Sequence, residues 1–179
     1  MPAGGVVAIL FAVWLTRDVL SRSAGSPKMA EIGGMIYEGA WAFLKRQYVT
    51  IGWYSLAIAI IIGVLVGVLG GEEGTENIGA FGIGWRTTVA FLVGAICSAV
   101  AGFIGMIVAV KTNARCAAAS QKGLAEAVKV ALRGAAVPGF LIVALSLIGV
   151  TVIFFAYGGA ENPEVAPQLI VAFGFGASF

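Results

Sequence analysis

Several residue types that support soluble enzymes are scarce or missing in this sequence. It has no histidine and two cysteines, and charged residues make up only 11% of its 179 residues. Without histidine, the commonest general base and the commonest transition-metal ligand are both excluded. Cys97 lies in an apolar run and Cys116 in a basic one, so we expect the two thiols to lie at different depths and not to form a disulfide. The first five residues carry no basic side chain, which argues against a cleaved secretory signal.

Apolar residues are abundant instead. Hydrophobic side chains make up 60% of the chain, and its mean hydropathy is +0.99. These values exceed those of soluble domains, which at this length need many more polar residues to cover their surface. We therefore expect an integral membrane protein.

Five apolar stretches predict membrane-spanning helices, at residues 3–20, 48–70, 84–110, 134–157 and 166–179. The first approaches the ~20 residues that a crossing requires only if it extends to Leu20, whereas the next three are long enough. The fifth is still apolar at Phe179 after about 13 residues, so we interpret it as a truncated span, with a re-entrant or interfacial tail as the alternative. The expected fold class is an all-α, polytopic transmembrane helix bundle with four complete spans and the start of a fifth.

Basic and acidic residues are sorted into different connections. Ten of the eleven basic residues lie at the end of the first span or in the connections after the first and third spans: Arg17, Arg22, Lys28, Lys45, Arg46, Lys111, Arg115, Lys122, Lys129 and Arg133. The alternate connections carry Glu72, Glu73, Glu76, Glu161 and Glu164, with Arg86 as their one basic neighbour. Because basic loops remain in the cytoplasm, we expect cytoplasmic connections at 21–47 and 111–133, external ones at 71–83 and 158–165, and an external amino terminus.

Local patterns predict the form of these connections. Ile32, Ile36 and Ala40 recur at helical spacing, and residues 121–132 are rich in good helix formers, so both cytoplasmic connections should extend the membrane helices. Residues 71–84 are rich in glycine and lack periodicity, which predicts an exposed connector.

Small residues recur at every fourth position in two spans. They are Gly63, Gly67 and Gly71 in one, and Gly94, Ser98 and Gly102 in the next. This spacing permits close helix packing, either at a dimer interface or, as we favour, between helices of one bundle. Ser98 and Thr151 are polar, but each can bond back to its own helix backbone. No charged residue lies in the middle of the three longer spans, so we do not expect ion-conducting groups here.

Few charged residues outside the spans suggest chemistry. Glu31 and Glu38 share a helix face, and with Lys28, Lys45 and Arg46 we interpret them as a solvated, salt-bridged surface. Four basic residues could attract phosphate or an anionic headgroup, although the positive-inside bias already explains them: Arg115, Lys122, Lys129 and Arg133. No nucleotide-binding glycine loop is present, and we expect no nucleic-acid partner. We assign no catalytic, cofactor-binding or metal-ligating residue.

Two segments resemble the amino-terminal part of membrane-bound, ion-translocating pyrophosphatases. Residues 36–48 read IYEGAWAFLKRQY, and residues 98–106 read SAVAGFIGM and continue to Asn113, Ala114 and Arg115. Residues 125–139 and 174–178 are similar to the same family in the same order, so the resemblance covers nearly the whole chain.

The resemblance implies a homodimer with about sixteen spans per chain, all helical because helices satisfy their own backbone groups. It implies hydrolysis of cytoplasmic inorganic pyrophosphate with Mg²⁺ held by aspartates, coupled to outward pumping of protons or sodium ions, with K⁺ or Na⁺ as a possible further cofactor. The family's aspartate motif and first gate arginine lie past the position of Phe179. This chain should therefore be a scaffold of four spans and part of a fifth in the cell membrane, inactive on its own.

One alternative stays open on the sequence alone. The chain could be a complete small non-enzymatic membrane protein or half of a secondary transporter, whose small-residue helices associate. This alternative predicts that translation stops after Phe179, whereas the pump interpretation predicts a reading frame that continues into an aspartate-rich motif.

Overall fold

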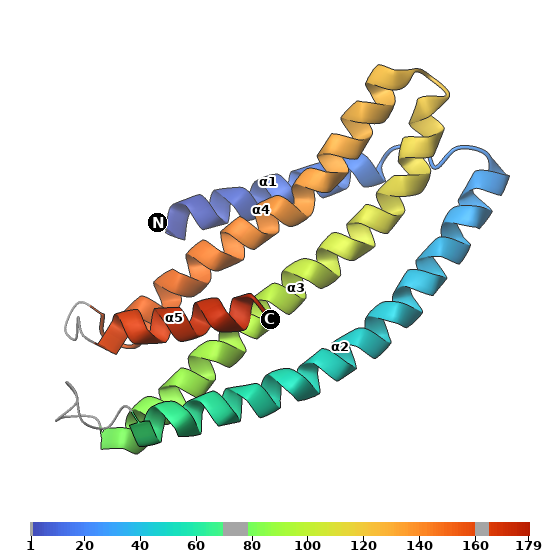
Figure 1. The fold of residues 1–179 in the computed structure, drawn as a ribbon. Helices are drawn as coiled ribbons and strands as arrows, with labels where there is room; N and C mark the ends of the chain where they lie inside the picture. Colours follow the sequence, from blue (N-terminus) through green and yellow to red (C-terminus); the bar gives the residue numbers. More distant parts are fainter. Residues whose placement is uncertain (1, 70–78, 160–164) are drawn as a thin grey trace. The chain divides into compact units, whose positions relative to one another are not determined.

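The computed structural model describes residues 2–69, 79–159 and 165–179, and these residues form five α-helices (Figure 1). The helices are α1 (Pro2–Leu20), α2 (Pro27–Leu69), α3 (Gly79–Ser120), α4 (Leu124–Ala156) and α5 (Val165–Ala177). The first four are long and apolar enough to cross a membrane, and α5 is a shorter apolar helix. The expected all-α fold class is confirmed.

Two helices are longer than a bilayer requires. At 1.5 Å per residue, the 43 residues of α2 and the 42 residues of α3 each extend for about 63–65 Å, roughly twice the thickness of a hydrocarbon core. The prediction of helix is confirmed for residues 32–44 in α2 and for residues 124–132 in α4, but it is wrong for residues 121–123, which form a turn with Gly123 at a φ of 130°. The side of the membrane on which they lie stays a prediction.

The last five residues of the predicted glycine-rich connector at 71–83 are helical instead. Residues 70–78, with Glu72, Glu73 and Glu76, lie outside the described residues, but α3 already begins at Gly79. Ile83 is only 2% exposed, and its packing outweighs the low helix propensity of Gly79 and Gly82. In the other predicted external connection, residues 160–164 with Glu161 and Glu164 also lie outside the described residues.

The end of α4 shows how glycine terminates a helix in this chain. The Gly159 N–H donates to the Phe154 carbonyl at 2.8 Å, and the Gly158 N–H donates to the Phe155 carbonyl at 3.2 Å. Gly158 has a φ of 64°, in the left-handed region that this paired-bond ending needs and that glycine adopts without a Cβ clash. The chain therefore leaves the helix at a position that the sequence specifies.

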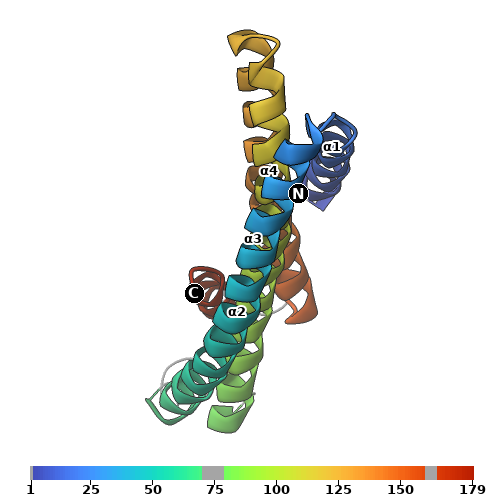
Figure 2. The same ribbon diagram turned by 90° about the vertical axis from the view of Figure 1, so that its right-hand side faces the viewer.

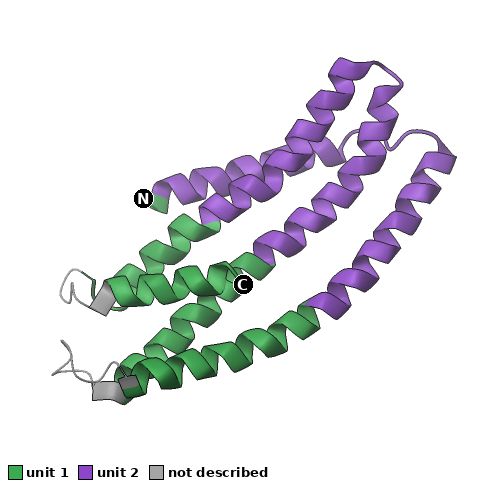
Figure 3. Ribbon diagram, viewed as in Figure 1, with its two compact units in different colours: residues 1–2, 48–99, 145–179 green, residues 3–47, 100–144 purple. Residues whose placement is uncertain are grey.

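The helices divide into two compact units (Figure 3). Unit 1 comprises Met1–Pro2, Tyr48–Ala99 and Leu145–Phe179, and unit 2 comprises Ala3–Gln47 and Val100–Ala144. The core of unit 1 gathers one residue from α3, one from α4 and three from α5: Ala90, Ile153, Leu169, Ala172 and Phe173. In unit 2, the segments of α3 and α4 that flank residues 121–123 run antiparallel (Figures 1 and 2), and the buried side chains include Val19, Val108, Val130 and Val137.

Much apolar surface remains exposed on the long helices. In the most apolar 18-residue stretch of each helix from α1 to α4, only 17% to 28% of the residues are buried. Side chains such as Val7, Trp53 and Phe155 are at least 65% exposed. In water such continuous apolar faces promote association, whereas lipid tails or further apolar helices cover them without loss.

Candidate functional site

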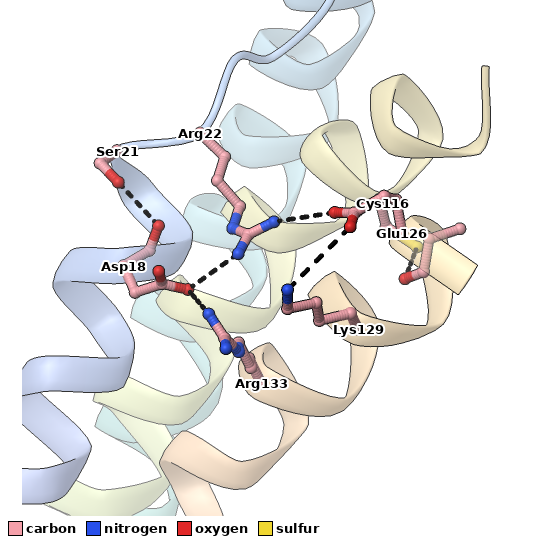
Figure 4. Close-up of polar contacts among 8 residues, drawn as sticks. Asp18, Ser21, Arg22, Cys116, Glu126, Lys129 and Arg133 are labelled. Carbon is pink, nitrogen blue, oxygen red and sulfur yellow. Dashed lines mark hydrogen bonds and ion pairs between the residues drawn. The ribbon is translucent and has the colours of Figure 1, made fainter. Parts of the chain in front are cut away.

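A cluster of charged side chains lies where α1 ends, entirely within unit 2 (Figure 4). We call Asp18, Arg22, Glu126, Lys129 and Arg133 the charged cluster. Asp18 and Arg22 come from α1 and the residues after it, and the other three come from the first turns of α4. The cluster therefore joins two helices that are more than a hundred residues apart in sequence.

Asp18 is held by two arginines. Its Oδ2 lies 2.7 Å from Arg133 Nη1 and 3.3 Å from Arg22 Nη2. All three side chains are about three-quarters buried, and the Arg133 guanidinium also lies 5.8 Å from the centre of the Trp14 ring. Since partial burial reduces screening by water, this arrangement stabilises the packing of α1 against α4 more than an exposed ion pair would.

Glu126 extends the network towards solvent. Its Oε2 lies 3.4 Å from Arg22 Nη1 and its Oε1 lies 4.0 Å from Lys129 Nζ (Figure 4). Glu126 and Lys129 are about half exposed, so these two contacts contribute less than those of Asp18. Arg22 thus lies between two carboxylates, and both ends of its guanidinium are used.

Arg115 of α3 bonds to the backbone at the end of α1, next to the charged cluster. Its Nε donates to the Arg22 carbonyl and its Nη2 to the Leu20 carbonyl, each at 3.1 Å, and its Nη1 donates to the Lys111 carbonyl at 2.7 Å. Carbonyls at the end of a helix lack partners within the helix and carry the negative end of its dipole. A cation bonded to them fixes the position of the α1 end against α3.

A cavity of about 340 Å³ lies beside the charged cluster. It is lined by the residues between α1 and α2, the last two turns of α3, the turn at 121–123 and the first two turns of α4. Three cations and one carboxylate are among its lining side chains: Arg22, Arg115, Lys122 and Glu126. We call it the basic pocket.

The sequence identified part of this site. It singled out Arg115, Lys122, Lys129 and Arg133, and all four belong to the charged cluster or its immediate surroundings. It missed Asp18, on which the two arginines converge. The available signal was an aspartate four residues before an arginine at the end of an apolar stretch, a spacing that favours an ion pair along a helix.

Glu31 and Glu38 are exposed, as expected of a solvated surface, but the salt bridges predicted for them are not found in the described part of the chain. Neither carboxylate forms an ion pair with a residue that the structure describes. Lys45 follows Glu38 by seven residues, or about 10 Å along the axis, which is beyond direct contact.

The carboxylates that the structure describes do not fit a magnesium site. Mg²⁺ requires oxygen ligands converging with near-octahedral geometry. Asp18 and Glu126 are bonded to basic side chains, and Glu31 and Glu38 lie two helical turns apart. Within residues 2–69, 79–159 and 165–179 there is no group of three histidine, cysteine, aspartate or glutamate residues suited to a metal ion.

Two of the small residues, Gly63 and Gly94, lie at close helix contacts in unit 1, as predicted, whereas Gly71 lies outside the described residues. A Cβ at Gly63 would overlap the Thr88 side chain, and a Cβ at Gly94 would overlap the Phe173 carbonyl. The Thr151 hydroxyl bonds to the Leu147 carbonyl at 2.6 Å, which confirms the predicted bond to its own helix. These contacts lie within one chain, and a dimer role for the same residues stays untested.

Unit 1 contains one basic residue in its sequence, Arg86 of α3. Its guanidinium carbon lies 6.0 Å from the Trp85 ring centre and 5.7 Å from the Tyr157 ring centre. A cation between amphipathic aromatic rings is typical of the boundary between lipid and water.

Comparison with known proteins identifies the family. Residues 6–179 match the family described as inorganic H+ pyrophosphatase. The chain is 46% identical over 179 residues, its whole length, to the K(+)-insensitive pyrophosphate-energized proton pump 2 of Moorella thermoacetica, of which it covers 24%. It is 44% identical over 178 residues to the K(+)-insensitive pyrophosphate-energized proton pump of Caldanaerobacter subterraneus subsp. tengcongensis, covering 97% of this chain and 25% of that protein.

A plant relative shows the same pattern. The chain is 32% identical over 184 residues to the pyrophosphate-energized membrane proton pump 3 of Arabidopsis thaliana, covering 97% of this chain and 23% of that protein. The chain thus spans about a quarter of the length of the curated relatives it matches. Its helical architecture and this match over residues 6–179 agree, and the chain is a multi-pass integral membrane protein that belongs to the inorganic H+ pyrophosphatase family.

Proposed function

We propose that these 179 residues are part of the membrane scaffold of a pyrophosphate-energised proton pump. The observation that carries this proposal is the family match over residues 6–179, together with relatives 46% and 44% identical whose names describe such pumps. The complete protein would hydrolyse inorganic pyrophosphate and use the free energy to move protons out of the cytoplasm.

In this proposal the chain positions other parts of the pump and does not carry out the chemical step. Mg²⁺ would be held by carboxylates outside these 179 residues, since Asp18 and Glu126 are engaged by arginines. Proton pathways through membranes use ionisable residues within the spans, and none lies in the middle of the spans predicted at 48–70, 84–110 and 134–157.

We further propose an orientation and an assembly. The basic connections 21–47 and 111–133 would be cytoplasmic, the connections 71–83 and 158–165 external, and the amino terminus external, as the positive-inside rule requires. The complete protein would be a homodimer, in keeping with the family resemblance. Two relatives are described by name as K(+)-insensitive, and we propose that this protein likewise transports protons without requiring K⁺.

The test uses the longest reading frame that contains these residues, expressed in membrane vesicles with the cytoplasmic face outward. Pyrophosphate with Mg²⁺ should cause proton uptake, detected with a pH-sensitive dye, at equal rates with and without K⁺. Chelation of Mg²⁺ should stop the uptake, and vesicles that contain only residues 1–179 should show none. Pyrophosphate hydrolysis by the 179-residue chain, or no proton uptake by the longer product, would contradict the proposal.

The alternative of a small non-enzymatic membrane protein or a half transporter has no observation in its favour. All three relatives described above are pumps by name, and each is about four times as long as the matched region. Sequencing of the reading frame downstream of Phe179 separates the two possibilities.

A further inference from the structure

The scaffold role does not account for the basic pocket. Its volume of about 340 Å³ is at the lower end of the ~300–1,000 Å³ typical of ligand sites. All its lining residues belong to unit 2, and they come from four different segments of the chain. A cavity of this size is large enough for one compact polar group.

The charge around the pocket is unbalanced. Five cations and two carboxylates make up the charged cluster and the pocket lining together, an excess of three positive charges: Arg22, Arg115, Lys122, Lys129 and Arg133 against Asp18 and Glu126. Both carboxylates are already bonded to cluster cations. The remaining positive charge has no counterion among the residues that the structure describes.

Two of the pocket's cations differ in what they can offer a ligand. Arg115 is held by three backbone carbonyls and contributes its charge from a fixed position. Lys122 lies in the turn before α4, where its backbone N–H donates to the Ala119 carbonyl at 2.9 Å, but its side-chain ammonium makes no ion pair or hydrogen bond with the described residues. Its three N–H donors are therefore available to an anion in the pocket.

Four helix ends border the pocket. Gly25 and Ser26 line the pocket immediately before α2, and Lys122 lines it two residues before α4. Ser26 caps α2 by accepting a bond from the Met29 N–H at 3.4 Å. The amino-terminal ends of α2 and α4 thus border the cavity together with the carboxy-terminal ends of α1 and α3, so the helix dipoles largely offset one another and the positive field comes from the side chains.

We propose that the basic pocket binds a phosphate group, either the headgroup of an anionic phospholipid or free inorganic phosphate. The lipid is consistent with α1, whose exposed residues Val6, Leu10 and Val13 are followed by the polar residues of the cluster, so that a headgroup in the pocket could extend its acyl chains along α1. This inference does not depend on the pump activity proposed above.

Two variants with matched controls test the proposal in the protein made from the longest reading frame. Lys122→Gln removes the unpaired cation, and Lys28→Gln removes an exposed lysine nearby that does not line the pocket. Ala119→Leu fills the pocket without a change of charge, and Ala117→Leu places the same side chain at an exposed position outside it.

Binding is measured in two arms. In the first, nanodiscs of phosphatidylcholine contain a minor share of phosphatidylglycerol, and native mass spectrometry measures phosphatidylglycerol retention. In the second, inorganic phosphate is titrated into the protein in pure phosphatidylcholine nanodiscs. Since one lysine near a surface contributes about 1 kcal/mol to phosphate binding, we expect Lys122→Gln to weaken binding about fivefold in the responding arm.

The outcomes separate the sources. A loss in the first arm alone identifies a lipid headgroup, and a loss in the second alone identifies free phosphate. Phosphate binding at another site would be equal in each variant and its control. The proposal is overturned if Lys122→Gln matches Lys28→Gln in both arms, or if Ala119→Leu binds as well as Ala117→Leu, because a diffuse surface field would then account for the affinity.

Discussion

Asp18 is the carboxylate on which the two arginines of the charged cluster converge. It accepts from Arg133 at 2.7 Å and lies 3.3 Å from Arg22, so it separates two cations that would otherwise face each other. Arg133 in turn lies over Trp14, one turn before Asp18 on the same helix. Removal of this one negative charge would therefore remove the ion pair between Asp18 of α1 and Arg133 of α4, and one of the two carboxylates beside Arg22.

We expect Asp18→Asn to destabilise the protein by about 1–3 kcal/mol, the usual cost of losing a bond to a charged partner that is largely buried. The measurement is the midpoint of thermal unfolding of the complete protein in nanodiscs. Glu38→Gln is the control, because it removes a carboxylate that forms no ion pair with the described residues. Equal midpoints for the two variants would show that the Asp18 contacts do not stabilise the fold.

Helices α3 and α5 approach each other through two glycines in unit 1. A Cβ at Gly94 of α3 would overlap the Phe173 carbonyl, and a Cβ at Gly176 of α5 would overlap the Phe91 carbonyl. Phe91 and Phe173 are each only 2% exposed. Because the opposing atoms are backbone, they cannot move aside as a flexible side chain would, and the contact requires glycine at both positions.

Gly94→Ala and Gly176→Ala should each force α5 away from α3, at a cost of about 1–3 kcal/mol or more. Gly174→Ala, two residues earlier in α5, is the matched control, since no atom lies within 4 Å of its new methyl group. That control should be neutral or stabilising by up to about 1 kcal/mol through helix propensity. Thermal unfolding of the three variants measures the effect, and a Gly94→Ala variant as stable as Gly174→Ala would contradict this account of the packing.

For the molecule as a whole, the distribution of charge and the length of the helices together indicate which helix ends project from the membrane. α2 and α3 are about twice as long as a bilayer core is thick, so part of each must lie outside the hydrocarbon. Basic residues are concentrated in 21–47 and 111–133, which assigns the projecting ends of these helices to the cytoplasm under the proposed orientation.

Cysteine labelling tests that orientation. In a background with Cys97→Ala and Cys116→Ser, a membrane-impermeant maleimide added to intact cells should label Gly74→Cys but not Ala117→Cys. Permeabilised cells should label both. The opposite pattern, with Ala117→Cys labelled from outside, would reverse the proposed topology of the connections.

The sequence predicts those features of the site that depend on neighbouring residues, and it misses those that depend on residues far apart in the chain. The basic residues of the pocket and cluster were identified because positive charges are visible in any window of sequence. Asp18 was missed because its main partner, Arg133, is 115 residues away. The salt bridges expected for Glu31 and Glu38 are missing among the described residues, because helical spacing permits a contact such as that of Lys28 with Glu31 but does not require it on an exposed face.

The sequence by itself determined that lipid covers this protein, how many apolar helices it forms, where most of them run and to which family it belongs. Composition, periodicity and motif order are properties of the chain, and helices satisfy their own backbone groups within one segment. The tertiary structure decided that residues 79–83 are helical, that Gly94 lies against Phe173 and that Asp18 joins Arg22 to Arg133. These features depend on the rotation of each helix and on its neighbours, which only the packing of distant segments sets.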